Sequence, residues 1–342
     1  MLEAVQLGNS GLRVSELCLG TMNFGIPGRG HQGDWTLTLE EARPIVKAAI
    51  DHGLFYFDCA DIYGRGASEE VVGALLKELL PRDEYVLATK IAMPMGRGAN
   101  QGGLSRKHVR EGIDACLQRT GHDYIDHLVI HRHPHGISGS ARTPIEETLE
   151  ALHDAVKEGK VLYLGGSSMF AWQFAELQLT AKMNNWTPFV SMQNHHNLVY
   201  REEEREMNPY CASTGVALTP WSPLARGILA GSYQGGFSGG STSRSQGQDG
   251  KRSQGLSQGD KVFPIAERVI ESASKYECSP AQIAVAWLKG RPEVTSPIVG
   301  VSKVSQLEDL VAAAAIELAA EDVAYLEELY QPVENLLSIG TS

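Results

Sequence analysis

The segment from Tyr85 to His131 reads YVLATKIAMPMGRGANQGGLSRKHVREGIDACLQRTGHDYIDHLVIH. Tyr85–Lys90 and Tyr124–His131 are short, largely apolar runs, whereas Ser105–Thr120 has the longer period of a helix. Ser105 stands directly before that helix, in the position of an N-cap residue. Because strands covered on both faces are largely apolar, this segment predicts two parallel strands joined by a helix.

The same alternation of strand and helix extends over nearly the whole chain. Eight strand-like runs are present: Ser15–Thr21, Phe55–Asp58, Tyr85–Lys90, Tyr124–His131, Val161–Ser167, Phe189–Gln193, Val216–Trp221 and Thr295–Gly300. Helix-like stretches lie between them, among them Leu39–His52, Ser68–Leu80, Pro144–Glu158 and Ala281–Lys289. Thr143-Pro144 and Ser279-Pro280 each look like an N-cap followed by a proline at the first helical position. The pattern predicts a closed (β/α)₈ barrel, with a doubly wound open sheet as the alternative.

The first residues of the chain do not follow the alternation. Val5–Val14 holds two short apolar runs around Asn9-Ser10-Gly11, which is typical of a β-hairpin that could cap the N-terminal mouth of the barrel. At ~150 residues per domain, 342 residues would suggest two domains, but one barrel can use this length. We therefore expect a single domain over residues 1–342.

Residues 231–259 differ in composition from the rest of the chain. Of these 29 residues, 21 are Gly, Ser or Gln. The segment therefore has too few apolar residues to bury a core of its own. The segment follows the seventh strand and is expected to be a flexible insertion. It is either an inert surface loop or a lid over a ligand, which Arg244, Lys251 or Arg252 would then approach.

Charge, hydropathy and cysteine usage exclude several classes of protein. The net charge is −11, from 30 basic and 41 acidic residues, which argues against nucleic-acid and anionic-membrane binding. The first residues lack the basic start and apolar run of a signal peptide, and no run approaches ~18 apolar residues, so we expect no membrane span. The five cysteines are far apart, which is typical of a reduced cytoplasmic protein without disulfides or a zinc ribbon.

Polar or aromatic residues stand where most of the predicted strands end. They are Asp58, Lys90, His131, Ser167 with Ser168, Gln193 with Asn194, and Trp221 with Ser222. In a barrel these strand ends form one face, where active sites lie. The pattern therefore predicts a polar pocket at the C-terminal mouth.

The residue types in this pocket suit proton transfer to a carbonyl oxygen. Lys90 ends a buried strand, so its ammonium needs a carboxylate, which Asp58 or Asp61 could supply. A lysine cation beside Tyr63 would lower the pKa of the phenol and make it a better acid near neutrality. His131 could orient the same carbonyl oxygen.

The run His131-Arg-His-Pro-His135 also invites a metal-site interpretation through His131, His133 and His135. Alternation would put the three rings on one side only if the strand continued, and Pro134 indicates that it stops. With no acidic or cysteine ligand nearby in the sequence, we expect no metal.

At these residues the chain resembles the aldo-keto reductases, of the bacterial and fungal aryl-alcohol-dehydrogenase-like branch. The resemblance is carried by motifs in the family's order: LGTMNFG (19–25), FDCADIYG (57–64), ATK (88–90), DYID (123–126), IHR (130–132), GGSSM (165–169), QNHHNL (193–198), WSPLARG (221–227) and PIVG (297–300). The resemblance implies a (β/α)₈ barrel that binds NADPH across its C-terminal face and reduces a small aldehyde or ketone.

The resemblance also implies roles for individual residues. The family's catalytic tetrad falls on Asp58, Tyr63, Lys90 and His131, with Tyr63 as the general acid. Cofactor contacts are implied at Gly20, Thr21, Met22, Asp58, Ser167, Ser168, Gln193, Trp221, Ser222, Leu224, Arg226, Gly227, Gly300, Ser302, Lys303, Gln306 and Asp309. Trp221 would stack on the nicotinamide, and Lys303 with Ser302 would bind a 2′-phosphate, which favours NADPH over NADH.

Substrate contacts are expected from loops after the first, second and fourth strands. The candidates are Asn23, Trp35 and His133. Two other functions stay open at this point: a nicotinamide-binding accessory subunit with little turnover, and a sugar-phosphate enzyme on the same fold.

Overall fold

The barrel strands form one parallel sheet in the order β10-β3-β4-β5-β6-β7-β8-β9. The computed structural model describes residues 1–30, 35–137, 142–233, 236–240, 246, 253–256 and 259–333. The strands are β3 (Cys18–Gly20), β4 (Tyr56–Asp58), β5 (Val86–Ile91), β6 (Ile125–Ile130), β7 (Val161–Ser167), β8 (Phe189–Gln193), β9 (Ala217–Leu218) and β10 (Ile298–Val299). Parallel bridges from Leu218 to Val294 and from Trp221 to Ile298 join the two edges. The sheet is therefore a closed barrel, as the sequence predicted, and the open-sheet alternative is wrong.

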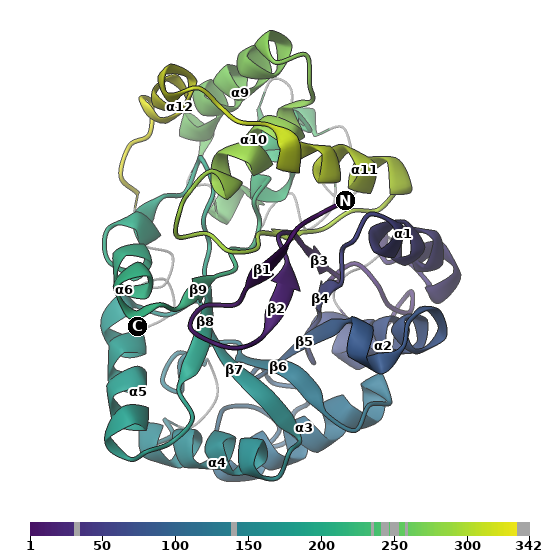
Figure 1. Cartoon of the computed structure of the whole chain (residues 1–342), viewed down its shortest axis with the longest axis vertical. Coiled ribbons are helices and arrows are strands. Elements are labelled where there is room, and N and C mark those ends of the chain that lie inside the picture. The colour runs from purple at the N-terminus through teal and green to yellow at the C-terminus, as the bar shows by residue number, and fades with distance from the viewer. Residues whose placement is uncertain are drawn as a thin grey trace.

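Helices cover the outside of the barrel as a ring (Figure 1). They are α1 (Leu39–Asp51), α2 (Ala67–Leu79), α3 (Arg106–Thr120), α4 (Ile145–Lys157), α5 (Ala171–Met183), α6 (Met207–Thr214), α9 (Phe263–Lys275), α10 (Pro280–Lys289), α11 (Val304–Ala312) and α12 (Ala320–Glu327). Most of the large apolar clusters lie between these helices and the outer faces of the strands. This packing fixes the strand ends, and the loops after them, on a rigid scaffold.

The helix starts test the capping predictions. Ser105 caps α3 by accepting a hydrogen bond from the backbone N–H of His108, and Ser279 caps α10 in the same way from Gln282. The Thr143 cap is wrong, because α4 begins one residue later, with Pro144 at the N-cap position and no side-chain cap. A proline at the N-cap has a fixed φ and no hydroxyl, so it ends the loop without satisfying a helix N–H group.

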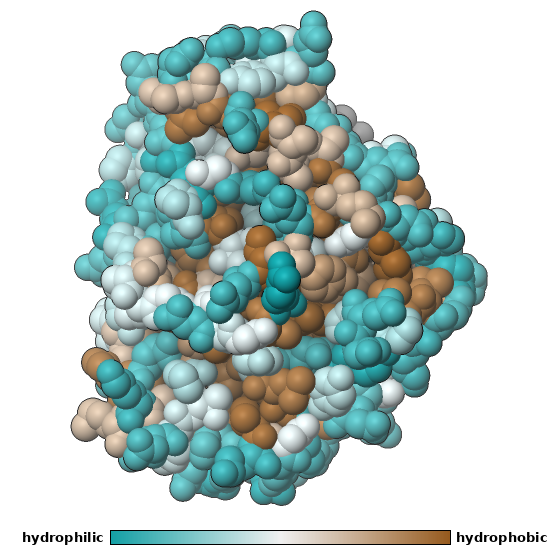
Figure 2. Space-filling model, in the orientation of Figure 1, coloured by the Kyte–Doolittle hydropathy of each residue, from teal (hydrophilic) through white to brown (hydrophobic). Residues whose placement is uncertain are grey.

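The predicted hairpin is present as β1 (Ala4–Gln6) paired antiparallel with β2 (Arg13–Ser15). Ser15 therefore belongs to β2, and the first barrel strand is shorter than the predicted Ser15–Thr21. Gly8 has a positive φ of 57°, and a Cβ there would lie 2.6 Å from the carbonyl oxygen of Val190, so the turn fits against the barrel only as glycine. Val190 and Gly215 lie at the N-terminal ends of β8 and β9, so the hairpin closes that mouth. Figures 1 and 2 show this face, with the hairpin crossing its centre.

The described parts of residues 231–259 lie partly against the core. Tyr233 is buried, and its ring packs edge-on against Phe237, which in turn contacts Phe263 of α9. Arg244, Lys251 and Arg252 lie outside the described residues. The beginning of the segment is thus anchored beside α9, and its role as a lid stays a prediction.

Candidate active site

Lys90 is the centre of a buried hydrogen-bonded group at the C-terminal mouth. Its Nζ donates to Oδ2 of Asp58 at 2.5 Å, to the carbonyl oxygen of Cys59 at 2.8 Å and to the hydroxyl of Tyr63 at 3.2 Å. An ammonium group has three N–H bonds, and these three acceptors use all of them. Because Tyr63 accepts from Lys90, its own hydrogen is directed away from the lysine.

Two carboxylates were candidates for the partner of Lys90, and the geometry separates them. Asp58 is the last residue of β4 and forms the ion pair with Lys90, while Gln193 Nε2 donates to its other oxygen at 2.9 Å. Asp61 is also buried, but neither of its carboxylate oxygens has a hydrogen-bond partner among the described residues. Burial raises the pKa of Asp61 well above its usual value, and Glu69 adds to the effect. Asp58 alone is therefore the counter-ion of the lysine.

The ionisation of Tyr63 differs from the sequence-based expectation. Burial raises the pKa of Tyr63, the Lys90 cation lowers it, and the Asp58 carboxylate raises it. The net direction is upward, so the expected lowering of the pKa is wrong for the site as it stands. Desolvation of a phenolate costs more here than the nearby lysine recovers. Tyr63 therefore keeps its proton at neutral pH, which is the form that a general acid requires.

Lys90 and His131 differ in charge: the lysine is a cation and the histidine is neutral. Burial by itself lowers the pKa of Lys90, but Asp58 and Tyr63 outweigh it and the net pKa is raised, so the lysine is a cation. Burial lowers the pKa of His131 well below its usual value, assisted by Arg132 and Lys90, so this imidazole is neutral. The ring of His131 faces the edge of Tyr63, with 5.9 Å between centroids and 85° between planes. A neutral imidazole in this place can donate one hydrogen bond to a group that Tyr63 also reaches.

The loop that carries Tyr63 is held in an unusual backbone conformation. Gly64, Arg65 and Gly66 follow it with φ of 55°, 51° and 86°. Arg65 is the one non-glycine residue of these three, and a left-handed φ costs such a residue free energy. Thr21 fixes the neighbouring backbone, because its hydroxyl donates to the Asp58 carbonyl and hydrogen-bonds Ser68 at the start of α2. The loop conformation thus sets the position of the phenol.

A stack of aromatic rings lies beside this group. Trp221 lies parallel to His195, with 4.1 Å between centroids and 6° between planes, and His195 stacks on Tyr200 at 4.5 Å. The indole Nε1 of Trp221 donates to the hydroxyl of Ser168 at 3.1 Å, which fixes the rotation of the ring. Ser168 itself has a positive φ of 50° and contacts the hydroxyl of Ser167 at 3.2 Å. The half-buried indole is therefore presented in one orientation, supported on one face.

The loop after β9 has a strained backbone. Ser222, Ala225, Arg226 and Gly227 have positive φ values of 56°, 45°, 57° and 99°. Three of these residues are consecutive, and the backbone N–H of Ala225 donates within the loop to the Ser222 carbonyl at 2.9 Å. Leu224 lies between them, and its carbonyl accepts from the N–H groups of Gly227 and Leu229. Strain at three non-glycine residues is costly and is typical of a ligand-binding loop.

The residues expected at the adenosine end lie around the start of α11. Gly300 and Lys303 are exposed, and Lys303 is the N-cap residue of the helix. Gln306 accepts hydrogen bonds through Oε1 from the backbone N–H and hydroxyl of Ser302. Asp309 accepts a hydrogen bond from the Ser279 hydroxyl at 2.6 Å, so its carboxylate contacts the start of α10.

The other residues predicted to contact cofactor or substrate lie in the loops after β3 and before α1, where they contact neighbouring parts of the protein. Gly20 ends β3, where a Cβ would lie 2.8 Å from the Ile298 side chain, and Met22 is half-buried in the next turn. Asn23 donates to the Val301 carbonyl and so links the loops after β3 and β10. Trp35 is half-buried in the loop before α1.

His133 and His135 contact each other and the neighbouring backbone. Nδ1 of His133 accepts from the backbone N–H of His135, and Nε2 of His135 hydrogen-bonds the Thr143 carbonyl. In the described part of the chain, no three His, Cys, Asp or Glu side chains are grouped to hold a metal ion.

A nicotinamide dinucleotide fits the chemistry of these groups. Arg226 and Lys303 are cations in the loops after β9 and β10, and Trp221 offers a flat ring whose rotation Ser168 fixes. These groups are compatible with a nicotinamide dinucleotide, and their individual cofactor contacts stay predictions.

Three side chains at this mouth are not among the site residues predicted from the sequence. His195 supports Trp221 from below, Arg132 lies beside His131, and Trp172 lies at the rim with 60% of its surface exposed. Arg132 has a sequence signal, because it directly follows the strand-end histidine. His195 lies in the QNHHNL motif, but its contact with Trp221 joins two strand ends and is not visible in the sequence. Trp172 has no sequence signal, since its contact with His133 joins segments far apart in the chain.

Comparison with known proteins identifies the family. The pattern of the Aldo/keto reductase family matches residues 16–331. The chain is 42% identical to the versiconal hemiacetal acetate reductase of Aspergillus parasiticus, over 97% of this chain and 98% of that protein. It is 41% identical to the aldo-keto reductase AMT2 of Alternaria alternata (95% and 91% covered). It is 44% identical to a Schizosaccharomyces pombe protein, C977.14c, that carries an aryl-alcohol dehydrogenase name (96% and 95% covered).

The chain therefore belongs to the aldo-keto reductase family, and it is an oxidoreductase of that family. Its relatives include proteins named as reductases and aryl-alcohol dehydrogenases, which implies carbonyl reduction with NAD(P)H. No helix in the described part of the chain is long and apolar enough to span a membrane.

Proposed function

We propose that this protein reduces an aldehyde or ketone to an alcohol with NADPH, and that Tyr63 donates the proton. One observation carries the proposal: the Tyr63 hydroxyl lies 3.2 Å from a lysine cation that is itself 2.5 Å from a buried carboxylate. A phenol with its own hydrogen free to point outward can protonate a carbonyl oxygen, and the cation stabilises the phenolate that forms. Asp58 keeps the lysine charged throughout.

Some residues of the site bind and orient the cofactor and substrate, and others transfer the proton. When bound, a reduced nicotinamide supplies a hydride to the carbonyl carbon. Trp221, Ser167, Ser168 and Gln193 orient the ring that carries this hydride, and neutral His131 donates a hydrogen bond that orients the carbonyl oxygen toward Tyr63. Burial of the site strengthens each of these interactions, because water is excluded from around the developing charge.

The N-terminus of α11 supports a preference for NADPH over NADH. Lys303 is the N-cap residue there, and Ser302 precedes it. A phosphate at a helix N-terminus is stabilised by the free N–H groups, and a lysine adds a charge-assisted hydrogen bond. NADH has no 2′-phosphate for these groups to bind. We expect the KM for NADH to exceed that for NADPH by at least about tenfold, since one such interaction is worth about 1.5–3 kcal/mol.

Aromatic carbonyl compounds suit the mouth best. Two relatives carry the names of an aryl-alcohol dehydrogenase and a hemiacetal acetate reductase, and Phe170, Trp172 and His133 place rings near the site. Stacking between an aromatic substrate and these rings would favour its binding.

Tyr63→Phe tests the acid assignment with the smallest possible change. NADPH oxidation with benzaldehyde should fall by about 10²- to 10⁴-fold in kcat, the usual contribution of a general acid. The affinity for NADPH, measured by quenching of tryptophan fluorescence, should stay the same, since the variant keeps the ring. Tyr124→Phe is the matched control, because Tyr124 lies away from this site and contacts Arg82 through its ring.

The same measurements separate catalysis from simple cofactor binding. Fluorescence quenching by NADPH with no turnover on a broad panel of aldehydes and ketones would indicate a nicotinamide-binding accessory protein. A Tyr63→Phe variant with near wild-type kcat would show that another group is the acid.

A further inference from the structure

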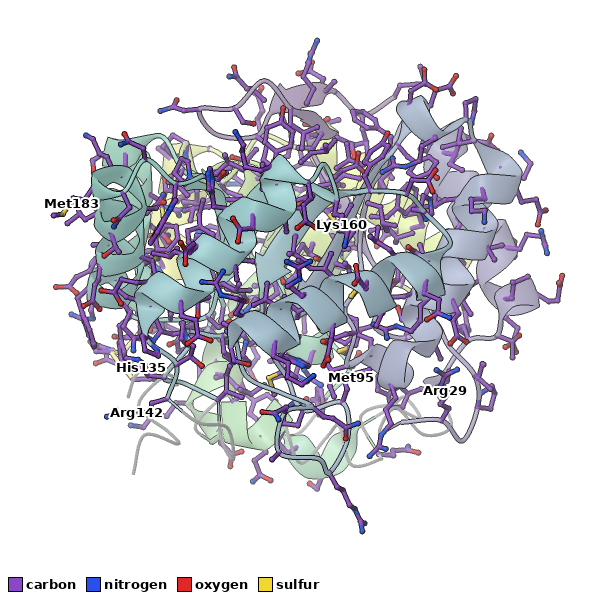
Figure 3. The ribbon with its side chains drawn as sticks, turned by 90° about the horizontal axis from the view of Figure 1, so that it is seen from below. Arg29, Met95, His135, Arg142, Lys160 and Met183 are labelled. Carbon is purple, nitrogen blue, oxygen red and sulfur yellow. The ribbon has the colours of Figure 1, made fainter. Side chains whose placement is uncertain are left out.

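Positive charge is concentrated in the loops that follow the first five barrel strands. Residues 21–38, 59–66, 92–105, 131–144 and 168–170 contain five arginines and two acidic residues in a chain whose net charge is −11. The arginines are Arg29, Arg65, Arg97, Arg132 and Arg142. Figure 3 shows Arg29, Met95, His135 and Arg142 in the lower half of the view, whereas Lys160 and Met183, which precede β7 and β8, lie in the upper half. The mouth thus attracts anions although the whole protein is acidic.

Two charged residues at this mouth, Arg29 and Asp61, contribute little net charge. Arg29 forms a two-pronged ion pair with Glu70 of α2. Asp61 is buried with a raised pKa and so carries little negative charge. Arg65, Arg97 and Arg142 are exposed to solvent, where screening weakens them.

Arg132 differs from the other four arginines because it lies in the active site itself. Its Nη1 donates to the backbone carbonyl of His131 at 2.6 Å, which holds the guanidinium beside that histidine. The side chain is half-buried, and burial lowers its pKa. Its charge contributes to the lowered pKa of His131 and acts against the raised pKa of Tyr63, so it acts on both rings.

No carboxylate among the described residues pairs with Arg132. Every salt bridge around this mouth involves another arginine or Lys90. A partly desolvated guanidinium with one hydrogen bond to a carbonyl retains further N–H donors in a planar fork, the geometry that binds a carboxylate through two bonds. Burying a cation without a counter-ion is costly, so a ligand that supplies the anion would be favoured here.

Aromatic side chains lie on the same side of the mouth as Arg132. His133 is buried next to it, its ring lies 6.5 Å from Trp172, and Trp172 is stacked parallel to Phe170 at 6.5 Å. An indole with 60% of its surface exposed offers a flat face to a substrate ring. The site therefore joins an anion-binding group, an aromatic rim and a proton donor.

We propose that Arg132 is a specificity-determining residue that binds a carboxylate on the substrate, so that the enzyme prefers aromatic aldehydes or ketones that carry an acidic group. This inference rests on the proposed carbonyl reduction and names its substrate class. The carbonyl group faces Tyr63 and His131, the ring lies along Trp172, and the carboxylate reaches the guanidinium.

The test compares 4-carboxybenzaldehyde with its neutral methyl ester, which has the same ring and the same aldehyde. Wild-type enzyme should show the higher kcat/KM for the carboxylate, mainly through a lower KM. In Arg132→Gln the ratio of the two kcat/KM values should fall by roughly 10- to 100-fold, the usual loss for a hydrogen bond between two charged groups. Arg132→Lys should recover part of the ratio, because it keeps the charge but loses the fork.

Arg142→Gln is the matched control, since it removes one exposed cation from the same loop. It should change the ratio by less than about threefold, because a screened surface charge contributes little. Equal kcat/KM values for the two substrates in the wild type, or an equal loss for both in Arg132→Gln, would overturn the proposal.

A binding measurement separates this proposal from the proposed function. Titration calorimetry of terephthalate, which has no aldehyde, should give a Kd about tenfold or more weaker for Arg132→Gln than for the wild type. If the wild type reduces neither aldehyde, the proposed carbonyl reduction fails, and this Kd then decides whether Arg132 binds anions. An unchanged Kd in the variant would exclude Arg132 as an anion site.

Discussion

Two groups of polar side chains lie inside the barrel, and both include a residue of β4. The lower group joins Tyr56 of β4, His127 of β6 and Ser191 of β8 through hydrogen bonds of 2.8 Å on either side of the imidazole. The upper group, two residues further along β4, joins Asp58, Lys90 and Tyr63. Each group contains a tyrosine and lies beside a histidine, His127 within β6 for the lower group and His131 just after β6 for the upper one. Only the upper group carries charge, on Asp58 and Lys90.

The difference between the groups separates a structural role from a chemical one. In the lower group every ring nitrogen of His127 is hydrogen-bonded, and burial lowers the pKa of His127 to about 3, with Lys90 adding to the effect. It is neutral, saturated and closed to solvent. In the upper group Nδ1 of His131 has no partner in the described part of the chain, and Tyr63 is half-buried. A site that must accept a ligand leaves hydrogen bonds unmade, whereas a site that only fills the core completes them.

Breaking the upper group should give the largest effect. Lys90→Met should lower kcat by about 10³-fold, because Tyr63 loses the cation that stabilises its phenolate. It should also lower the free energy of unfolding by about 3–5 kcal/mol at pH 8, since Asp58 is left as a buried, unpaired carboxylate. Steady-state kinetics and urea unfolding measure the two effects.

The double variant Asp58→Asn/Lys90→Met tests whether the Asp58–Lys90 ion pair serves the reaction rather than the stability of the fold. With both charges removed, most of the lost stability should return, while kcat should stay low. Recovery of activity together with stability would contradict the assignment of Lys90 to the reaction.

Tyr56→Phe makes the same substitution in the lower group as Tyr63→Phe makes in the upper one. Removing its hydroxyl leaves Nδ1 of His127 without a partner, which should cost about 1–3 kcal/mol of unfolding free energy. The kcat should change by less than about threefold, because the hydroxyl belongs to the closed lower group. A large loss of kcat without a loss of stability would show that the lower group takes part in the reaction.

Glu203 tests the effect of burial on a carboxyl group through stability alone, because it is buried but lacks the lysine partner of Asp58. Burial raises the pKa of Glu203 to about 8, although a hydrogen bond with Asn194 opposes the shift. A pKa raised on folding means that the protein is most stable below the unfolded-state value of 4.5 and loses stability as pH rises toward 8. Glu203→Gln should therefore be about 1–3 kcal/mol more stable than the wild type at pH 8. Thermal unfolding at pH 4 should show no such gain, and a gain of equal size at both values would contradict the raised pKa.

Much of the fold could be predicted from the chain because it depends on local patterns. The eight strands, five of the helices and the N-terminal hairpin follow from apolar periodicity and turn residues, and Ser105 and Ser279 cap the helices that they precede. Errors fell at boundaries: Ser15 belongs to the hairpin, and Thr143 caps nothing. In both cases the competing position was one or a few residues away, and tertiary packing made the choice.

The sequence by itself determined which residue types stand at the strand ends, because a barrel turns every strand end toward one mouth. Only the tertiary structure decided how those residues interact. It paired Lys90 with Asp58, which the family resemblance implies, and not with Asp61, a choice that the residue pattern alone left open, because the distance between two side chains on neighbouring strands depends on register. It raised the pKa of Tyr63 where proximity to lysine alone predicts a lower one, because burial acts on a group only once the surrounding chain has excluded water.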